Sequence, residues 1–137
     1  MAESFCRKII SEKLNCDVDE TEKIGYKVIS AGVMGITGVP ASNEVLDICA
    51  EKGLDVRSHE SRALTAELIN ASDFIFVMSK SHRETIVRLR PEASDKCMLL
   101  DDDSDISDPI GSSIEVYRKC AKQIEHALEK RMDEILI

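Results

Sequence analysis

Asp108 is the residue in this sequence best placed to do chemistry. It stands in the run Ser107-Asp108-Pro109-Ile110-Gly111, where proline restricts the backbone and glycine frees it. Such a run forms a stiff turn. A carboxylate held on a stiff turn can give or take a proton at a substrate atom. The same residues also fit an ordinary Asp-Pro turn, so this run alone leaves both readings open.

A helix directly after the turn would hold it in place. Ser112 and Glu115 have the Ser-x-x-Glu spacing of a capping box, which predicts a helix start. Apolar residues then recur at helical spacing over about residues 113–134. The buried face is expected to hold Tyr117, Cys120, Ile124, Leu128 and Met132 or Ile135.

Helices and strands are predicted to alternate along the rest of the chain. Helices are expected over residues 1–14, 43–52, 65–69 and 81–90, and strands over residues 26–31, 74–78 and 96–100. Residues 15–23 are expected to be a polar connection. The run Phe74–Met78 is continuously apolar, which is typical of a strand covered on both faces. This order predicts one α/β domain over residues 1–137, with a mostly parallel sheet and helices on both faces.

In such a sheet, ligands bind beyond the carboxyl ends of the strands. The loops at residues 32–40, 79–81 and 101–112 are therefore expected to line one edge. The last loop carries Asp101, Asp103 and Asp105, which imitate the start of a calcium loop. Calcium loops need Gly at position six and Glu at position twelve, where this chain has Ile106 and Ser112. The run is read as a solvated acidic loop.

Composition excludes several function classes. The formal net charge is −8 and the chain has no Trp, so we expect neither nucleic acid nor an anionic membrane as a partner. No secretory signal or membrane-spanning stretch is expected. The five cysteines are scattered and include no Cys-x-x-Cys, which predicts free thiols in a cytoplasmic protein. The three histidines form no ligand-spaced cluster with the cysteines and no nucleotide loop occurs, so we expect no metal and no cofactor.

Several segments together resemble the low-molecular-weight protein-tyrosine phosphatase family. They are Met1–Phe5, Ser30–Val33, Ser58–Thr65 and Ser107–Gly111, and their order and spacing run over the whole chain. The bacterial branch that contains protein-arginine phosphatases looks most similar. Residues Asp108–Tyr117 resemble its run Asp-Pro-Phe-Gly-Gly-Ser-Ile-Asp-Ile-Tyr.

The resemblance implies a three-layer parallel-sheet fold and a phosphoprotein phosphatase that works through a cysteinyl-phosphate intermediate. It implies that Asp108 is the general acid and that His59 and Ser30 support the phosphate-binding loop. It places Met34 and Ile110 in the substrate-binding cleft. Tyrosine-directed members usually have aromatic residues at the place of Ile110, so phosphotyrosine and phosphoarginine both stay open as substrates.

The chain departs from the family at the phosphate-binding loop, which is Cys-x5-Arg directly before the Met-Ala-Glu segment. Here Met1-Ala2-Glu3 opens the sequence, and no cysteine has an Arg six positions later. We therefore expect a chain that lacks the first, central strand and the nucleophile, and that is inactive alone. It is either an N-terminally truncated phosphatase or a degenerate, non-catalytic binding module.

Two further expectations follow from this departure. Exposed strand edges would favour a swapped or self-associated oligomer. An arsenate reductase of the same fold is a further alternative, but it would need extra redox cysteines near residues 79–81, and the next cysteine after that loop is Cys97.

Overall fold

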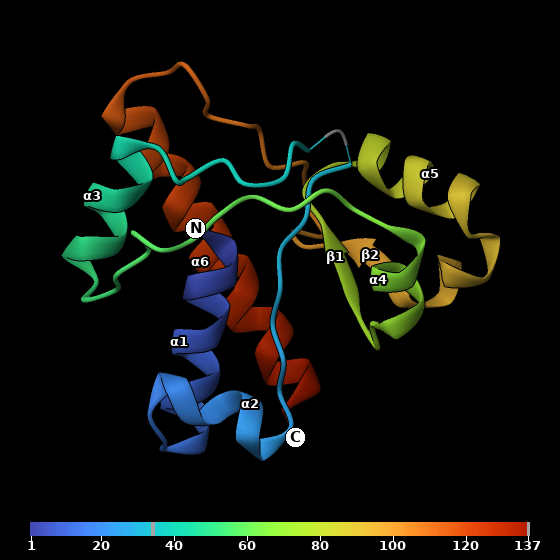
Figure 1. The fold of residues 1–137 in the computed structure, drawn as a ribbon, viewed down its shortest axis with the longest axis horizontal. Helices are drawn as coiled ribbons and strands as arrows, with labels where there is room; N and C mark the ends of the chain where they lie inside the picture. Colours follow the sequence, from blue (N-terminus) through green and yellow to red (C-terminus); the bar gives the residue numbers. More distant parts are fainter. Residues whose placement is uncertain (34, 137) are drawn as a thin grey trace.

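The computed structural model describes residues 1–33 and 35–136, and shows two groups of helices flanking a short parallel sheet (Figure 1). The helices and strands, in chain order, are α1 (Ala2–Leu14), the 3-10 helix η1 (Val18–Glu20), α2 (Thr21–Ile24), α3 (Asn43–Glu51), α4 (Ala66–Ala71), β1 (Ile75–Val77), α5 (Lys80–Leu89), the 3-10 helix η2 (Pro91–Lys96), β2 (Cys97–Leu99) and α6 (Ile114–Ile135). No helix among the described residues is long and apolar enough to cross a membrane.

The sheet consists of β1 and β2, which pair in parallel with Ile75 opposite Cys97 and Val77 opposite Leu99. Successive side chains of a strand point to opposite faces. In agreement, Ile75 and Val77 belong to one apolar cluster, while Phe76 packs against another. The α/β class with a parallel sheet and helices on both faces is thus confirmed.

The larger cluster lies where α1, α3 and α6 meet. Its buried residues are Phe5, Cys6, Ile9, Ile10, Ile48, Cys49, Leu100, Ile106, Tyr117, Cys120, Ala121, Ile124, Ala127, Leu128 and Met132. The smaller cluster lies on the other side of β1 and β2, against α4 and α5. Its buried residues are Ile69, Val77, Ile86, Ala93 and Cys97. Burial of each large apolar side chain stabilises the fold by about 1.5–3 kcal/mol, so the helices hold the sheet from both sides.

Side-chain caps set the starts of three helices. The hydroxyls of Ser42, Thr65 and Ser79 accept hydrogen bonds from backbone N–H groups in the first turns of α3, α4 and α5. The helix expected to begin at residue 81 begins at Lys80 instead, with Ser79 as its N-cap. The capping box predicted at Ser112 is wrong, because α6 begins after Ser113, whose side chain makes no cap bond.

The strand predicted over residues 26–31 is not formed. That stretch runs as an uncoiled trace past α6, and among the described residues no strand is assigned to it (Figure 1). The nearest ladder contact is an isolated parallel bridge between Gly32 and Ala63. The connection predicted over residues 15–23 is also wrong, because it contains η1 and most of α2.

Candidate functional site

Asp108 lies on an exposed loop between β2 and α6. Its Oδ1 accepts a hydrogen bond from the Ile110 backbone N–H at 3.1 Å, which closes a local turn. Gly111 follows with φ of 78°, a left-handed conformation that side chains rarely adopt. The Asp108 carboxyl is therefore held by its own turn and stays open to solvent.

The chain just before Asp108 is anchored to the sheet and to α6. Ile106 is buried, and its N–H donates to the Met78 carbonyl at 2.7 Å. The Cys120 thiol of α6 donates to the Ser107 carbonyl, with 3.6 Å between Sγ and oxygen. Asp105 accepts from the Lys80 N–H at the start of α5. Hydrogen bonds thus fix the segment that leads into the exposed turn to the sheet and to α5 and α6.

Gln123 of α6 holds the acidic part of the same loop. Its Nε2 donates to the Asp101 carboxylate at 2.9 Å, to the Ser104 hydroxyl at 3.3 Å and to the Asp105 carbonyl at 3.4 Å. The hydrogen bond from Gln123 is the main reason that the pKa of Asp101 lies below its usual value. Sequence reasoning missed Gln123, because nothing in its neighbours along the chain indicates a loop contact.

Arg131 of α6 fastens the start of this loop to the end of β2. Its guanidinium donates to the carbonyls of Leu99 and Leu100 and contacts the carboxylates of Asp102 and Glu134. It also lies over the Phe76 ring, 5.5 Å from the centroid. The residue is only 6% exposed, so it is a buried charge that the carboxylates and carbonyls around it compensate.

A second polar group gathers around the Glu3 carboxylate near the start of α1. Glu3 accepts from the Ser30 N–H at 2.8 Å and from its hydroxyl at 3.2 Å. It also lies 3.4 Å from Arg7 and 3.7 Å from His59 Nδ1. The structure therefore brings His59 and Ser30 together on Glu3. Sequence reasoning had not assigned Glu3 a role, although its i,i+4 spacing to Arg7 was a readable signal.

The Cys120 thiol of α6 lies beside the Asp108 loop, because it donates to the Ser107 carbonyl. Burial raises the pKa of the Cys120 thiol, the charge of Asp108 raises it further, and the Met1 amine lowers it. Burial lowers the pKa of the Met1 amine, while Cys49, Glu3 and Cys120 raise it. Asp108 and the Met1 amine therefore shift the pKa of Cys120 in opposite directions.

The predicted cleft residues are only partly described. Ile110 is 77% exposed, so it does not pack into the core. Met34 lies outside the described residues. Tyr117, expected in the core, is 4% exposed.

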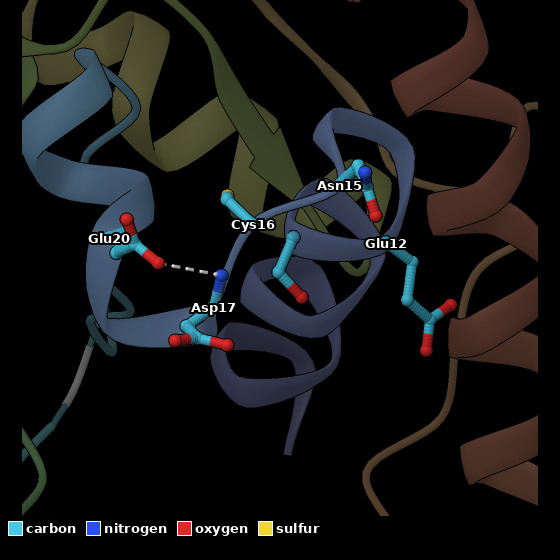
Figure 2. Close-up of a pocket in the computed structure, with 6 residues that line it drawn as sticks. Glu12, Asn15, Cys16, Asp17 and Glu20 are labelled. Atoms are coloured by element: carbon cyan, nitrogen blue, oxygen red, sulfur yellow. Dashed lines mark hydrogen bonds between the residues drawn. The ribbon is translucent and has the colours of Figure 1, made fainter.

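A hollow of about 380 Å³ lies at the other end of α1. It is lined by Ser11, Glu12, Asn15, Cys16, Asp17 and Glu20. Figure 2 shows the Glu20 carboxylate reaching back to the Asp17 N–H, as in a capping box. None of the predicted site residues lines it. Within residues 1–33 and 35–136, no group of three His, Cys, Asp or Glu side chains is arranged to hold a metal ion.

The arrangement combines a solvent-open carboxylate with the start of a 13-residue helix. The free N–H groups and dipole of a helix N-terminus favour an anion there. A solvent-open carboxylate can give or take a proton.

Comparison with known proteins places the chain among phosphatases. The family model for low molecular weight phosphotyrosine protein phosphatase matches residues 2–136. The chain is 34% identical to a protein-arginine-phosphatase of Geobacillus stearothermophilus over 116 residues, which are 81% of this chain and 78% of the relative. It is 32% identical to the low molecular weight protein-tyrosine-phosphatase Etp of Escherichia coli K12, over 90% of this chain and 78% of the relative. The structure of Vibrio vulnificus Wzb in complex with benzylphosphonate superposes with a TM-score of 0.82 at 28% identity, over 97% of this chain and 87% of that one.

Proposed function

The chain belongs to the low molecular weight phosphotyrosine protein phosphatase family, and from this membership we propose that Asp108 is the general acid for hydrolysis of a phosphorylated protein. The observation that supports this role most strongly is the exposed Asp108 carboxyl on a loop anchored to α5 and α6. The proton of its carboxyl passes to the leaving atom as the bond from phosphorus to that atom breaks. The resulting carboxylate then takes a proton from the water that attacks the phosphoryl-enzyme intermediate.

The nucleophile of this reaction, as the family resemblance implies it, is a thiolate in a Cys-x5-Arg loop. No cysteine of residues 1–137 has an Arg six positions later. Burial raises the pKa of Cys6 to about 11 and raises the pKa of Cys97 and Cys120, which works against thiolate formation. We therefore propose that residues 1–137 supply the acid but no nucleophile, and that they do not turn over phosphate alone.

Ile110, two residues after Asp108, bears on the class of substrate. Ile110 is aliphatic and 77% exposed, so it offers an apolar contact without an aromatic ring for stacking. A phosphoarginine side chain needs no such ring. The two relatives named above act on arginine and tyrosine phosphate by their names. We propose a protein that carries phosphoarginine or phosphotyrosine as the substrate, with proton transfer to nitrogen or to oxygen.

The test joins a strand and a Cys-x5-Arg segment of the kind that the family resemblance implies to Met1, and measures hydrolysis of p-nitrophenyl phosphate. We expect the unmodified chain to match buffer and the joined chain to turn over. Asp108→Asn in the joined chain should lower kcat by about 10²- to 10⁴-fold. Asp103→Asn, a change in the same acidic loop, should leave kcat within about twofold, because nothing places Asp103 beside the proton transfer.

Two outcomes would contradict the proposal. Turnover by the unmodified chain that disappears in Asp108→Ala would mean that one of its own cysteines is the nucleophile. Full activity of Asp108→Asn in the joined chain would remove Asp108 from the reaction. Phosphoarginine and phosphotyrosine peptides, compared at equal concentration in the joined chain, decide the substrate class.

A second candidate is a non-catalytic binding module, supported by the absence of a Cys-x5-Arg motif from residues 1–137. A joined chain that folds and yet shows no turnover and no affinity for inorganic phosphate would favour it. We also propose a cytoplasmic location, because all five cysteines are free and the cytoplasm keeps thiols reduced.

A further inference from the structure

Three side chains of α6 hold the loop between β2 and α6 at successive points. The Arg131 guanidinium donates to backbone carbonyls at the end of β2 and just beyond it. The Gln123 amide donates to the middle of the loop, and the Cys120 thiol donates to the Ser107 carbonyl near its end. The loop therefore runs alongside α6 in the opposite direction, and the turn with Asp108 begins directly after the last contact (Figure 1).

The contact made by Gln123 joins several parts of the loop to α6 at once. Its Nε2 lies 2.9 Å from the Asp101 carboxylate, 3.3 Å from the Ser104 hydroxyl and 3.4 Å from the Asp105 carbonyl. The bond to the carboxylate is the shortest, and a hydrogen bond to a charged acceptor is stronger than one to a neutral acceptor. The same carboxylate accepts from the Asp103 N–H at 3.0 Å, so it connects the amide to the loop backbone.

The middle of the loop, residues 103–105, has little else to hold it. These residues are exposed, and their other hydrogen bond to the body of the protein, within the part of the chain that the structure describes, joins Asp105 to the Lys80 N–H at 3.2 Å. The carboxylates of Asp101, Asp103 and Asp105 carry like charges, which repel one another. Without the Gln123 amide, we expect this segment to move away from α6.

We propose that Gln123 is a positioning residue for the proposed hydrolysis, because its amide holds the loop where the Asp108 carboxyl can reach the leaving atom. This inference rests on the proposed role of Asp108. A displacement of about 1 Å at a reacting group can cost about 10²-fold in rate. Gln123 therefore acts on the reaction through the loop, and its loss should slow proton transfer more than it weakens binding of the phosphate.

The first measurement follows amide hydrogen exchange in the unmodified chain by NMR. The amide of buried Ile106, hydrogen-bonded at 2.7 Å to the residue after β1, reports opening of the loop. In Gln123→Ala it should exchange at least about tenfold faster, because the loop opens more often. The Leu100 amide, hydrogen-bonded to β1 at 2.8 Å, should keep its rate. The control Lys122→Ala changes an exposed neighbour on α6 and should leave both amides unchanged.

The second measurement uses the joined chain and two esters that differ in the leaving group. Phenolate leaves less readily than p-nitrophenolate, so hydrolysis of phenyl phosphate depends more on the general acid. Gln123→Ala should lower kcat/KM by about tenfold for phenyl phosphate and by less than about threefold for p-nitrophenyl phosphate. In a chain that already carries Asp108→Asn, it should add no further loss, because the acid that Gln123 positions is gone. Gln123→Lys, which keeps a donor for Asp101, should recover most of the rate with phenyl phosphate.

Several results would overturn the inference. One is an unchanged exchange rate of the Ile106 amide in Gln123→Ala. Another is a loss of kcat/KM that is equal for both esters or that persists beside Asp108→Asn, because a general loss of folded protein would act in that way. A rate lowered by Asp108→Asn but not by Gln123→Ala would overturn the inference and leave the proposed function intact. No effect of Asp108→Asn on either ester would overturn both.

Discussion

The Glu3 carboxylate accepts hydrogen bonds from both the backbone N–H and the hydroxyl of Ser30, at 2.8 and 3.2 Å. This contact ties the first turn of α1 to the extended stretch, which Arg7 of the same helix also holds through the Val28 carbonyl. Glu3 also meets Arg7 and His59, and its side chain is 13% exposed. The carboxylate therefore replaces a neighbouring strand at this edge.

Glu3→Ala should lower the free energy of unfolding by about 1–3 kcal/mol, because it leaves the Ser30 N–H without an acceptor and removes the ion pair with Arg7. Glu3→Gln keeps one acceptor oxygen and should cost less. Urea unfolding of the two variants measures the difference. Glu12→Ala, which removes an exposed partner of Lys8 on the same helix, should cost less than about 0.5 kcal/mol. Equal losses for Glu3→Ala and Glu12→Ala would contradict the role of Glu3.

Arg131→Ala should destabilise the fold by about 2–4 kcal/mol, because the carbonyls of Leu99 and Leu100 lose their donor in a buried position. Arg131→Lys should recover only part of this, since an ammonium cannot reproduce the planar set of donors. Thermal unfolding compares the two Arg131 variants with Lys130→Ala. Lys130 is an exposed neighbour of Arg131 and also pairs with Asp102. A loss for Lys130→Ala as large as that for Arg131→Ala would show that only the charge on Asp102 matters.

Gln123→Ala should raise the pKa of Asp101 toward its usual value, because the largest cause of the lowered pKa is the Gln123 hydrogen bond. A lowered pKa in the folded state stabilises the fold above the unfolded pKa of about 3.9, and this contribution is lost as pH falls through the folded pKa. Between the unfolded and the folded pKa of Asp101, Gln123→Ala should therefore lose less stability on acidification than the wild type does. A carboxyl-detected NMR titration reads the pKa directly. Lys122→Ala, an exposed neighbour on α6, is the control and should leave the pKa of Asp101 unchanged.

Cys6 should make the fold sensitive to alkali. Burial raises the pKa of its thiol from 9.0 to about 11. Because the folded state holds the proton more tightly, its contribution is complete below about pH 9 and is lost as pH rises toward about 11. The loss should reach about 2 kcal/mol by pH 11 at order-of-magnitude accuracy. Urea unfolding between pH 8 and 11 measures it, and Cys6→Ala should show a flatter profile. An identical slope in the wild type and Cys6→Ala would disprove this origin.

Local patterns in the sequence were sufficient for most helices and for the class of fold. The apolar period of residues 1–14 and of the last helix matches α1 and α6, because an amphipathic face must bury against a core wherever the chain folds. The apolar run Phe74–Met78 contains β1 for the same reason. The helices expected to start at residues 43 and 65 begin at Asn43 and Ala66, because the Ser42 and Thr65 caps act within one turn of each helix.

The predictions that failed depended on a partner elsewhere in the chain. Residues 26–31 have strand composition, but a strand needs a neighbour at hydrogen-bonding distance, and here one edge meets α1 side chains and the other meets none among the described residues. The helix starts assigned to Ser81 and Ser112 failed because the actual N-caps are Ser79 and Ser113, and the loop before each helix sets where it begins.

At the candidate site too, short-range features could be predicted from the sequence, and long-range contacts could not. The sequence by itself determined that an acidic residue stands on a Pro- and Gly-stiffened turn before a long helix, because those effects act between residues close in the chain. Only the tertiary structure decided that Gln123 and Arg131 anchor this loop and that Glu3 joins Ser30 to His59. These contacts join residues 18 or more positions apart in the sequence, so they form only when α1 and α6 pack against the sheet.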